Sequence, residues 1–434
     1  MKEGMTARER GAIRASLFVV LATGSGSAAN FMYQWIAARS LDDDAFSLLA
    51  AMLAVITICV LPGPPLSIAI VRRLTSSRGS RVSSPLALPS LAPARRVGIF
   101  AGLTILLAIG IGTSVVQSDR LHLSSGGGVL LWIAAAFVTV SWLVIYPDLA
   151  RAQARGEFSR YGRSHALLSA TRLGFGGGAI LAGAEVWGAL ICLAPGPWLV
   201  RALLVRGVRT EGVLEAPWLR ALLPMLAATG GLHALVVIDV VFARVHFGAS
   251  DPTAAGAYAA CATLARALFH LPFAATAVTV QRTAAARAEG RSHRSILLTN
   301  LGLVLVLVAI GGGFLATFPS TILDVFAGEG RYSAQAPWLR SLLVPMALAS
   351  VAAVPAHYLL ALGSRAPVYV LGIAPFVLAG LLARPPETPA GLIPPLIAVI
   401  GAVAAILLVC AWFAGGSTAE GSNTMRRDLP KEAS

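Results

Sequence analysis

Four charged side chains lie inside long apolar stretches of this 434-residue chain: Arg172, Arg201, Asp239 and Arg266. A charge within a bilayer costs about 2.5 to 3.5 kcal/mol on insertion scales, so each is a functional candidate. A guanidinium group holds phosphate oxygens through two parallel hydrogen bonds and stays charged at physiological pH. The deep arginines are therefore candidates to bind a phosphorylated ligand. The alternative is an internal ion pair, with Asp239 or Asp148 as the acid.

Two of these arginines lie far from either expected membrane surface. Arg172 follows Arg163 by nine residues, which is about 13 Å of helix. Arg266 lies about 18 Å from the expected start of its stretch near residue 254. Side chains at such depths cannot easily extend to water, so each is expected to face a hydrated cavity or an acidic partner.

We predict that phosphate is bound by Arg266 and Arg172, with Arg39 and His270 as further members of the set. His270 follows Arg266 by four residues and therefore shares its face of a helix. Arg201 lies close to the expected inner surface, where its long side chain can reach the head groups. Its expected role is anchoring.

Asp239 precedes Arg244 by five residues, near the expected outer surface. Its carboxylate could bind a coupling proton or sodium ion, or it could form an ion pair with Arg244, and the sequence favours the pair. His233 and His357 stand singly among apolar residues and are expected to be hydrogen-bonded packing residues. The four cysteines also lie in apolar stretches without metal-like spacing, so neither a metal ion nor a cofactor is expected.

The apolar stretches that hold these residues are long enough to cross a membrane. Hydrophobic residues make up 56% of the chain and charged residues 12%, against about 25% in soluble proteins. A membrane-spanning helix needs about 20 apolar residues. The sequence predicts twelve spans, the first between Arg14 and Arg39 and the others at about 45–71, 97–117, 128–150, 164–183, 186–205, 221–243, 254–280, 295–317, 336–362, 366–383 and 390–413.

Basic residues gather in alternate connections between these spans. Twenty-five Lys and Arg residues fall in the tails and even-numbered connections, against six in the odd-numbered ones. Because cytoplasmic connections carry the excess of positive charge, both termini are expected to be cytoplasmic. The net charge of +14 therefore reports topology and contact with anionic lipid head groups, and nucleic acid is not expected as a partner.

The halves of the chain carry two similar stretches, residues 38–72 and 243–282. In each, an Ala-Arg pair ends a span, a short acidic connection follows, and the next span contains proline and ends in arginine. Six spans in each half, in the same orientation, are typical of a parallel repeat. We predict an N-terminal lobe over 1–210, a C-terminal lobe over 211–414 and a cytoplasmic tail over 415–434. The alternative is a compositional likeness between Ala-rich, Arg-flanked spans.

Three consecutive acids, Asp42, Asp43 and Asp44, lie in the first outer connection. Such carboxylates could bind a metal or act as a base in a membrane glycosyltransferase. Only about six residues separate the two spans, however, too few to build an enzyme site. The sequence favours a turn that caps the N-terminus of the second span, where negative charge is stabilised.

The chain also resembles a known family. The segment Asp239–Arg282, with Ala-Gly-Ala-Tyr-Ala-Ala at 255–260 and Leu-Pro at 271–272, is similar to the seventh and eighth spans of bacterial polysaccharide-biosynthesis (Wzx-type) flippases. These belong to the MOP superfamily, which also holds the multidrug extrusion (MATE) proteins and the lipid II flippase. Segments 37–46, 156–158 and 326–332 agree with the family in the same order.

This resemblance implies an all-α polytopic membrane protein of about twelve helices in two six-helix lobes. It implies a transporter, and not an enzyme, that flips a polyprenyl-diphosphate-linked oligosaccharide across the bacterial inner membrane for cell-surface polysaccharide synthesis. Its implied partners are that substrate, membrane lipids, and polysaccharide-assembly glycosyltransferases or a polymerase.

Two other functions stay open. The first is a MATE-like multidrug or cation antiporter. The lack of a carboxylate in span one argues against it, since drug antiporters of the superfamily commonly have a coupling acid there. The second and weaker one is the polyprenyl-phosphate-dependent glycosyltransferase.

Overall fold

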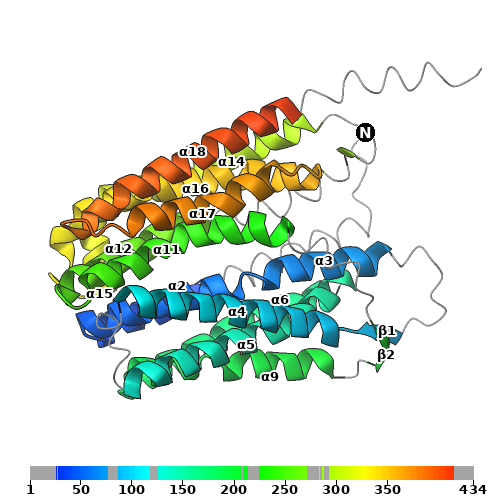
Figure 1. Cartoon of the computed structure of the whole chain (residues 1–434), viewed down its shortest axis with the longest axis horizontal. Helices are drawn as coiled ribbons and strands as arrows, with labels where there is room; N and C mark the ends of the chain where they lie inside the picture. Colours follow the sequence, from blue (N-terminus) through cyan, green and yellow to red (C-terminus); the bar gives the residue numbers. More distant parts are fainter. Residues whose placement is uncertain are drawn as a thin grey trace, which may run out of the picture. The chain divides into compact units, whose positions relative to one another are not determined.

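The computed structural model describes residues 26, 28–76, 87–117, 126–155, 157–206, 209–213, 224–270, 283, 286–287 and 293–414. These ranges are almost entirely helical (Figure 1), as the sequence predicts. They divide into two compact units. The first holds the described residues of 1–229, 240–259 and 326–328, and the second those of 230–239, 260–325 and 329–434.

Eight helices in the described part of the chain are long and apolar enough to cross a bilayer, with mean hydropathies between 1.5 and 2.8. Helix is expected at these positions because a backbone surrounded by lipid must satisfy its hydrogen bonds within the segment. Within the described residues, each predicted span falls on one helix or on consecutive helical segments. The first half of the first span and residues 221–223 of the seventh lie outside the described residues. The end of the eighth span, with Pro272 and Arg282, lies outside the described residues.

The first unit begins with a helix over residues 28–40. Its further helices are α2 (Asp43–Val60), α3 (Gly63–Ser76), α4 (Ala92–Gln117), α5 (Gly126–Ala154), α6 (Phe158–Thr171), α7 (Gly178–Leu181), α8 (Val186–Ile191) and α9 (Pro195–Val205). A π-helical segment, η2 (Arg172–Gly177), joins α6 to α7. This unit also takes the second half of α11 and the beginning of α12.

The second unit holds the remaining helices. A π-helical segment, η3 (Leu226–Gly230), leads into α11 (Gly231–Phe247), and α12 (Pro252–His270) follows. The others are α14 (Arg294–Thr317), α15 (Pro319–Ala327), the short 3-10 segments η4 (Ser333–Gln335) and η5 (Pro389–Leu392), α16 (Ala336–Ala361), α17 (Ala366–Leu382) and α18 (Ile393–Ala414). The short helix α15, between the ninth and tenth spans, is not apparent from the sequence pattern.

The second predicted span is broken, as its prolines indicate. Helix α2 ends at Val60, a turn covers Leu61 and Pro62, and α3 starts at Gly63. A residue before proline disfavours the helical conformation, whereas proline is tolerated in the first turn of a new helix. The Leu66 N–H donates to the Pro62 carbonyl at 3.1 Å, so the helical hydrogen bonding resumes at once.

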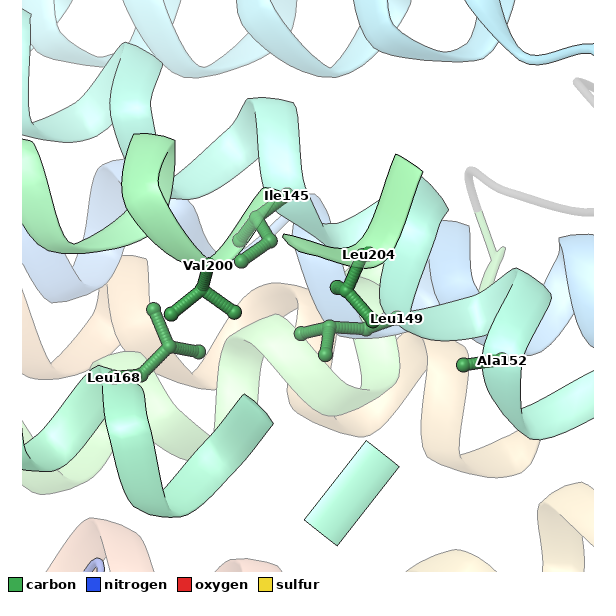
Figure 2. Packing of buried hydrophobic residues seen from close by; sticks show 6 residues of the cluster. All are labelled: Ile145, Leu149, Ala152, Leu168, Val200 and Leu204. Atoms are coloured by element: carbon green, nitrogen blue, oxygen red, sulfur yellow. The ribbon is translucent and has the colours of Figure 1, made fainter. Parts of the chain in front are cut away.

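Helix α5 forms the centre of a core with α6 and α9. Ile145, Leu149 and Ala152 of α5 pack there with Leu168 of α6 and with Val200 and Leu204 of α9, and all six are buried (Figure 2). In a bilayer the lipid tails are as apolar as leucine, so such a core holds the helices together mainly through van der Waals packing. The packing fixes the position of α6 and of the π-helical segment that follows it.

Two short strands are the exception to the helical architecture. Strand β1 (Ala87–Ser90) pairs in parallel with β2 (Arg209–Val213), with Ala87 opposite Arg209 and Leu88 opposite Thr210. The strands belong to the connections after the second and the sixth predicted spans. Both are even-numbered connections, so their pairing agrees with the prediction that they lie on one side of the membrane.

Candidate functional site

Arg172 stands at the first position of the π-helical segment, in the first unit. Its guanidinium carbon lies 5.0 Å from the centre of the Tyr33 ring, a cation–π contact. Arg172 forms no ion pair with any acid among the described residues, and its Nε is buried without a hydrogen-bond partner. It is thus a partly buried cation whose counter-charge is not supplied by the described part of the chain.

Local sequence explains why the chain tolerates this geometry. Four of the residues that follow Arg172 are glycines, at 174 and 176–178, and π-helical bulges of this kind are frequent at functional sites. At Gly176 an added Cβ would lie 2.9 Å from the Tyr33 ring. Only a residue without a side chain lets the helix of residues 28–40 approach so closely. Gly26 similarly faces Ser169, whose Oγ would lie 2.8 Å from an added Cβ.

The helix of residues 28–40 presents polar atoms beside this cation. Asn30 Oδ1, Tyr33 Oη and Gln34 Oε1 are buried and form no hydrogen bond with any described residue. Residues three and four positions apart share a helix face, so these three groups lie on the side that carries Tyr33 to Arg172. Buried polar groups are normally hydrogen-bonded, and unsatisfied ones call for a bound partner such as water or a ligand.

Arg266 has a different environment, in the second unit. Its Nη2 lies 2.6 Å from Asp239 Oδ1, and its Nε donates to the Val236 carbonyl at 2.8 Å. Asp239 is completely buried and the Arg266 side chain is 13% exposed. An ion pair is one of the roles that the sequence leaves open for each residue, the other being phosphate binding for Arg266 and ion coupling for Asp239.

The expected partner of Asp239 was Arg244, and the structure corrects this. Residues five positions apart are rotated by about 140° around a helix, so the two side chains leave α11 on different faces. Arg244 donates from Nη1 to Asp44 Oδ1 at 2.5 Å and to Ser47 Oγ at 2.8 Å. Both acceptors belong to the start of α2.

Each acid of the Asp42–Asp44 run has its own contact. The Ala45 N–H donates to Asp42 Oδ1 at 2.7 Å, so Asp42 is the N-cap of α2, as predicted. Asp43 Oδ2 accepts from Thr253 Oγ1 at 2.8 Å, and Asp44 binds Arg244. The run therefore caps α2 through Asp42, and it contacts α11 and α12 through Asp44 and Asp43.

The other candidates from the sequence have contacts of their own. Arg39 is exposed, with its guanidinium carbon 4.9 Å from the Trp35 ring centre. His270 is the last residue of α12, and its ring centre lies 5.3 Å from that of Phe269. His357 Nδ1 lies 2.7 Å from the Ala353 carbonyl within α16, a hydrogen bond of the kind expected for a packing histidine.

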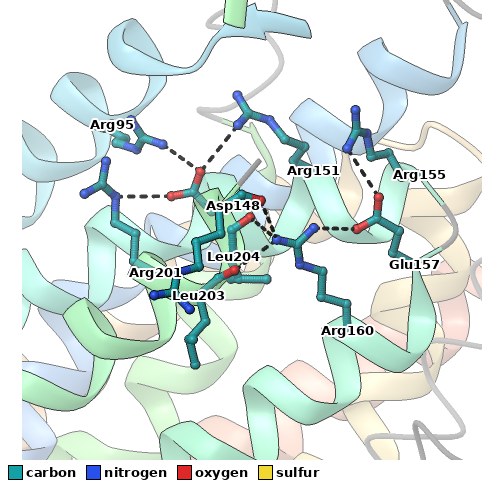
Figure 3. A network of polar contacts seen from close by, with 10 residues as sticks. Arg95, Asp148, Arg151, Arg155, Glu157, Arg160, Arg201, Leu203 and Leu204 are labelled. Atoms are coloured by element: carbon teal, nitrogen blue, oxygen red, sulfur yellow. Dashed lines mark hydrogen bonds and ion pairs between the residues drawn. The ribbon is translucent and has the colours of Figure 1, made fainter. Parts of the chain in front are cut away.

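The sequence offers Asp148 as an ion-pair acid, but the cluster of three arginines around it was not predicted. The carboxylate of Asp148, 2% exposed, lies 2.7 Å from Arg95 Nη2, 3.8 Å from Arg151 Nη1 and 3.3 Å from Arg201 Nε (Figure 3). Arg201 is thus part of an ion network. The spacing of Asp148 and Arg151 could have indicated their pairing, because residues three apart are neighbours on a helix. The arginines of α4 and α9 approach only through tertiary packing.

The fold and these contacts define a multi-pass membrane protein made of helices. No protein-family model and no curated protein matches the chain by sequence. Solved structures do match. An inward-facing multidrug resistance MATE family transporter of the MOP superfamily has a TM-score of 0.67 at 11% identity, covering 93% of this chain and 99% of that one.

Two further MOP-type structures agree over similar lengths. The lipid II flippase MurJ, in an inward closed conformation, has a TM-score of 0.64 at 12% identity, with 92% of this chain and 87% of that chain covered. A MOP superfamily transporter from Pyrococcus furiosus has a TM-score of 0.63 at 12% identity, with 94% and 96% covered. The chain therefore has the fold of MOP superfamily transporters.

Proposed function

We propose that this protein is a membrane transporter that flips a polyprenyl-diphosphate-linked oligosaccharide from one leaflet to the other for cell-surface polysaccharide synthesis. The observation that carries the proposal is Arg172, a partly buried cation with a buried Nε and no acidic partner among the described residues. A diphosphate would supply the missing counter-charge and accept from the guanidinium fork. The unsatisfied groups of Asn30, Tyr33 and Gln34 would complete the polar surface for the head group.

Arg266 takes second place in this proposal. A phosphate could bind it only by displacing Asp239, and that would leave a buried carboxylate without its ion-pair partner. Arg172 requires no such exchange. Arg39 and His270 remain proposed phosphate-binding residues on the evidence of the sequence alone.

A MATE-like antiporter of cationic compounds is the second candidate, since structures of that type share the fold. A cationic cargo needs an available buried carboxylate. The buried acids among the described residues are Asp148 and Asp239, and each contacts arginine. The binding pocket of the Pyrococcus furiosus transporter has a reverse polarity, which suggests a different function for that protein. Pockets of more than one polarity therefore occur on this fold, and the contacts around Arg172 favour an anionic cargo here.

A glycosyltransferase has less support, because the acids that suggested it have other contacts. Asp42 caps α2, and Asp43 and Asp44 bind Thr253 and Arg244. We place the transporter in the bacterial inner membrane with both termini in the cytoplasm, working beside glycosyltransferases or a polymerase of polysaccharide assembly. The cytoplasmic termini rest on the distribution of basic residues between connections, and the inner membrane and these partners rest on the resemblance to polysaccharide-biosynthesis flippases.

Flipping in reconstituted vesicles tests the proposal. The probe is an undecaprenyl diphosphate that carries a dye-labelled disaccharide, and the rate is followed by chemical quenching of outer-leaflet dye. We expect Arg172→Ala to slow flipping at least tenfold and Arg172→Lys to retain part of it, because lysine keeps the charge without the fork. Arg96→Ala, at an exposed position of α4, is the matched control. Full flipping by correctly inserted Arg172→Ala protein would refute the proposal, and sodium- or proton-driven export of a cationic dye would favour the antiporter.

A further inference from the structure

A cavity of about 550 Å³ opens between α6 and α9 in the first unit. Its lining includes Arg160, Arg163, Ser164, Leu167, Leu203 and Leu204. Arg160 Nη2 donates to the carbonyls of Leu203 and Leu204 at 2.9 and 2.7 Å. These are among the last carbonyls of α9, while Arg160 belongs to the first turn of α6. One end of the cavity therefore lies where α6 begins and α9 ends, at the level expected for a membrane surface.

The polar end of the cavity carries more positive than negative charge. Glu157 accepts from Arg155 Nη1 at 3.3 Å and from Arg160 Nη1 at 3.2 Å (Figure 3). Arg163 is exposed, and within the described residues it forms neither an ion pair nor a hydrogen bond. Two guanidinium groups thus share one carboxylate, and the guanidinium of Arg163 is available to an anion.

The remaining wall is apolar and continues onto the lipid-facing side of α9. Leu167 and Leu203 line the cavity. Leu203 is 44% exposed, and Leu199, one turn earlier on the same face of α9, is 46% exposed. In a membrane such exposed leucines contact acyl chains. The cavity therefore combines a cationic rim with an apolar wall that is open to lipid.

We propose that this cavity binds an anionic phospholipid of the surrounding membrane, with the phosphate at Arg163 and an acyl chain along Leu167 and Leu203. Phosphate oxygens are the preferred acceptors of a guanidinium fork, and basic pockets between membrane helices are suited to anionic head groups. A free phosphate ion would satisfy the rim but leave the apolar wall uncovered. The site is separate from Arg172 and does not depend on the transport substrate.

Lipid-dependent stability of the full chain in detergent provides the test. Phosphatidylglycerol should raise the thermal unfolding midpoint in a saturable manner, whereas phosphatidylcholine should not. Arg163→Gln should weaken the apparent affinity for phosphatidylglycerol about fivefold, the usual effect of one basic residue near an anionic surface. Arg163→Lys should retain most of it. Arg96→Gln removes the same charge from an exposed site outside the cavity and should change nothing.

Leu167→Trp tests the apolar wall separately, because an indole there would occupy the space of the acyl chain. It should weaken the effect of phosphatidylglycerol while Arg163 is intact. Three results would overturn the proposal: equal stabilisation by both lipids, equal stabilisation by inorganic phosphate at the same concentration, or equal losses in Arg163→Gln and Arg96→Gln. If Arg163→Gln does not fold, an unchanged lipid response of Leu167→Trp would overturn it as well.

Discussion

Arg244 and Asp44 are 200 residues apart in sequence and form an ion pair with an N–O distance of 2.5 Å. The two side chains differ in environment: that of Arg244 is 1% exposed, and that of Asp44 is 47% exposed. The pair joins the end of α11 to the start of α2, within the first unit. It therefore connects the two similar stretches of the sequence, residues 38–72 and 243–282.

Replacing the acid of this pair by alanine should destabilise the protein more than replacing it by asparagine. Asp44→Ala leaves the buried guanidinium of Arg244 with neutral acceptors only. We expect the free energy of unfolding to fall by roughly 2 kcal/mol, less than the 3 to 5 kcal/mol for breaking a fully buried pair, because Asp44 is half-exposed. Asp44→Asn keeps an acceptor oxygen and should lose less. Thermal unfolding in detergent measures both. A midpoint of Asp44→Ala equal to the wild type would contradict the prediction.

The two similar stretches carry matching caps, at Asp42 and at Asp251. Asp251 Oδ1 accepts from the Ala254 N–H at 2.9 Å, as Asp42 Oδ1 accepts from Ala45. Each Asp→Ala substitution should cost about 1 kcal/mol of stability, and each Asp→Asn much less, since Asn caps as well as Asp. Unfolding midpoints of the four variants, measured side by side, provide the comparison. An Asn variant as unstable as its Ala counterpart would mean that charge, and not capping, is what matters.

Substitutions at Arg266 distinguish its two roles. As a structural partner of Asp239, it should be required for abundance: Arg266→Ala would strand a buried carboxylate and lower the amount of protein in the membrane. The neutral pair Arg266→Gln with Asp239→Asn should restore that amount. Quantitative immunoblotting of membranes gives the answer. Normal abundance of Arg266→Ala with loss of flipping would instead support phosphate binding at this residue.

Stability should decline as the pH is lowered because of His293, which lies at the N-cap of α14. Burial, and next the charge of Arg287, lower the pKa of His293, so the folded protein favours the neutral imidazole. The stabilising contribution is complete above the unfolded pKa of about 6.5 and is lost as pH falls below it. Unfolding midpoints between pH 8 and pH 5 should decline less in His293→Gln. Parallel declines in both proteins would place the pH dependence elsewhere.

The orientation can be mapped with single cysteines and an impermeant thiol reagent. Sites in odd-numbered connections should react from outside the cell, and sites in even-numbered ones should not. The outer set is Ser124, Asp251 and Glu387, and the inner set is Ser80, Glu157 and Glu289. Reversed labelling at two of these positions would be incompatible with twelve spans and cytoplasmic termini.

Features that depend on a few neighbouring residues could be predicted from the sequence. Asp42 caps α2 because its acceptor oxygen and the Ala45 N–H are three residues apart, a local geometry. The break after Val60 follows from the prolines in the same way. Apolar length and basic residues between stretches are likewise local in sequence, and they predicted the helical spans.

The partners of buried charges could not be predicted to the same extent. The expected pair of Asp239 with Arg244 assumed that neighbours in one helix meet, whereas the rotation of the helix separates their side chains. Tertiary packing instead pairs Asp239 with Arg266 and Arg244 with Asp44. The cluster around Asp148 draws arginines from three helices. Depth alone identified Arg172 and Arg266 as candidates. The structure shows that Arg266 forms an ion pair with Asp239, and that Arg172 forms none with any described acid.

The parallel pairing of β1 with β2 bears on the order in which the chain assembles. All the helices from α4 to α9 lie between the two strands in sequence, so the hydrogen bonds of Ala87 and Leu88 with residues of β2 cannot form until that whole segment has been synthesised. Contacts between distant residues carry the largest loop-closure entropy and form late. Because synthesis proceeds from the N-terminus, protection of the β1 amides from hydrogen exchange would mark the moment at which the first unit closes.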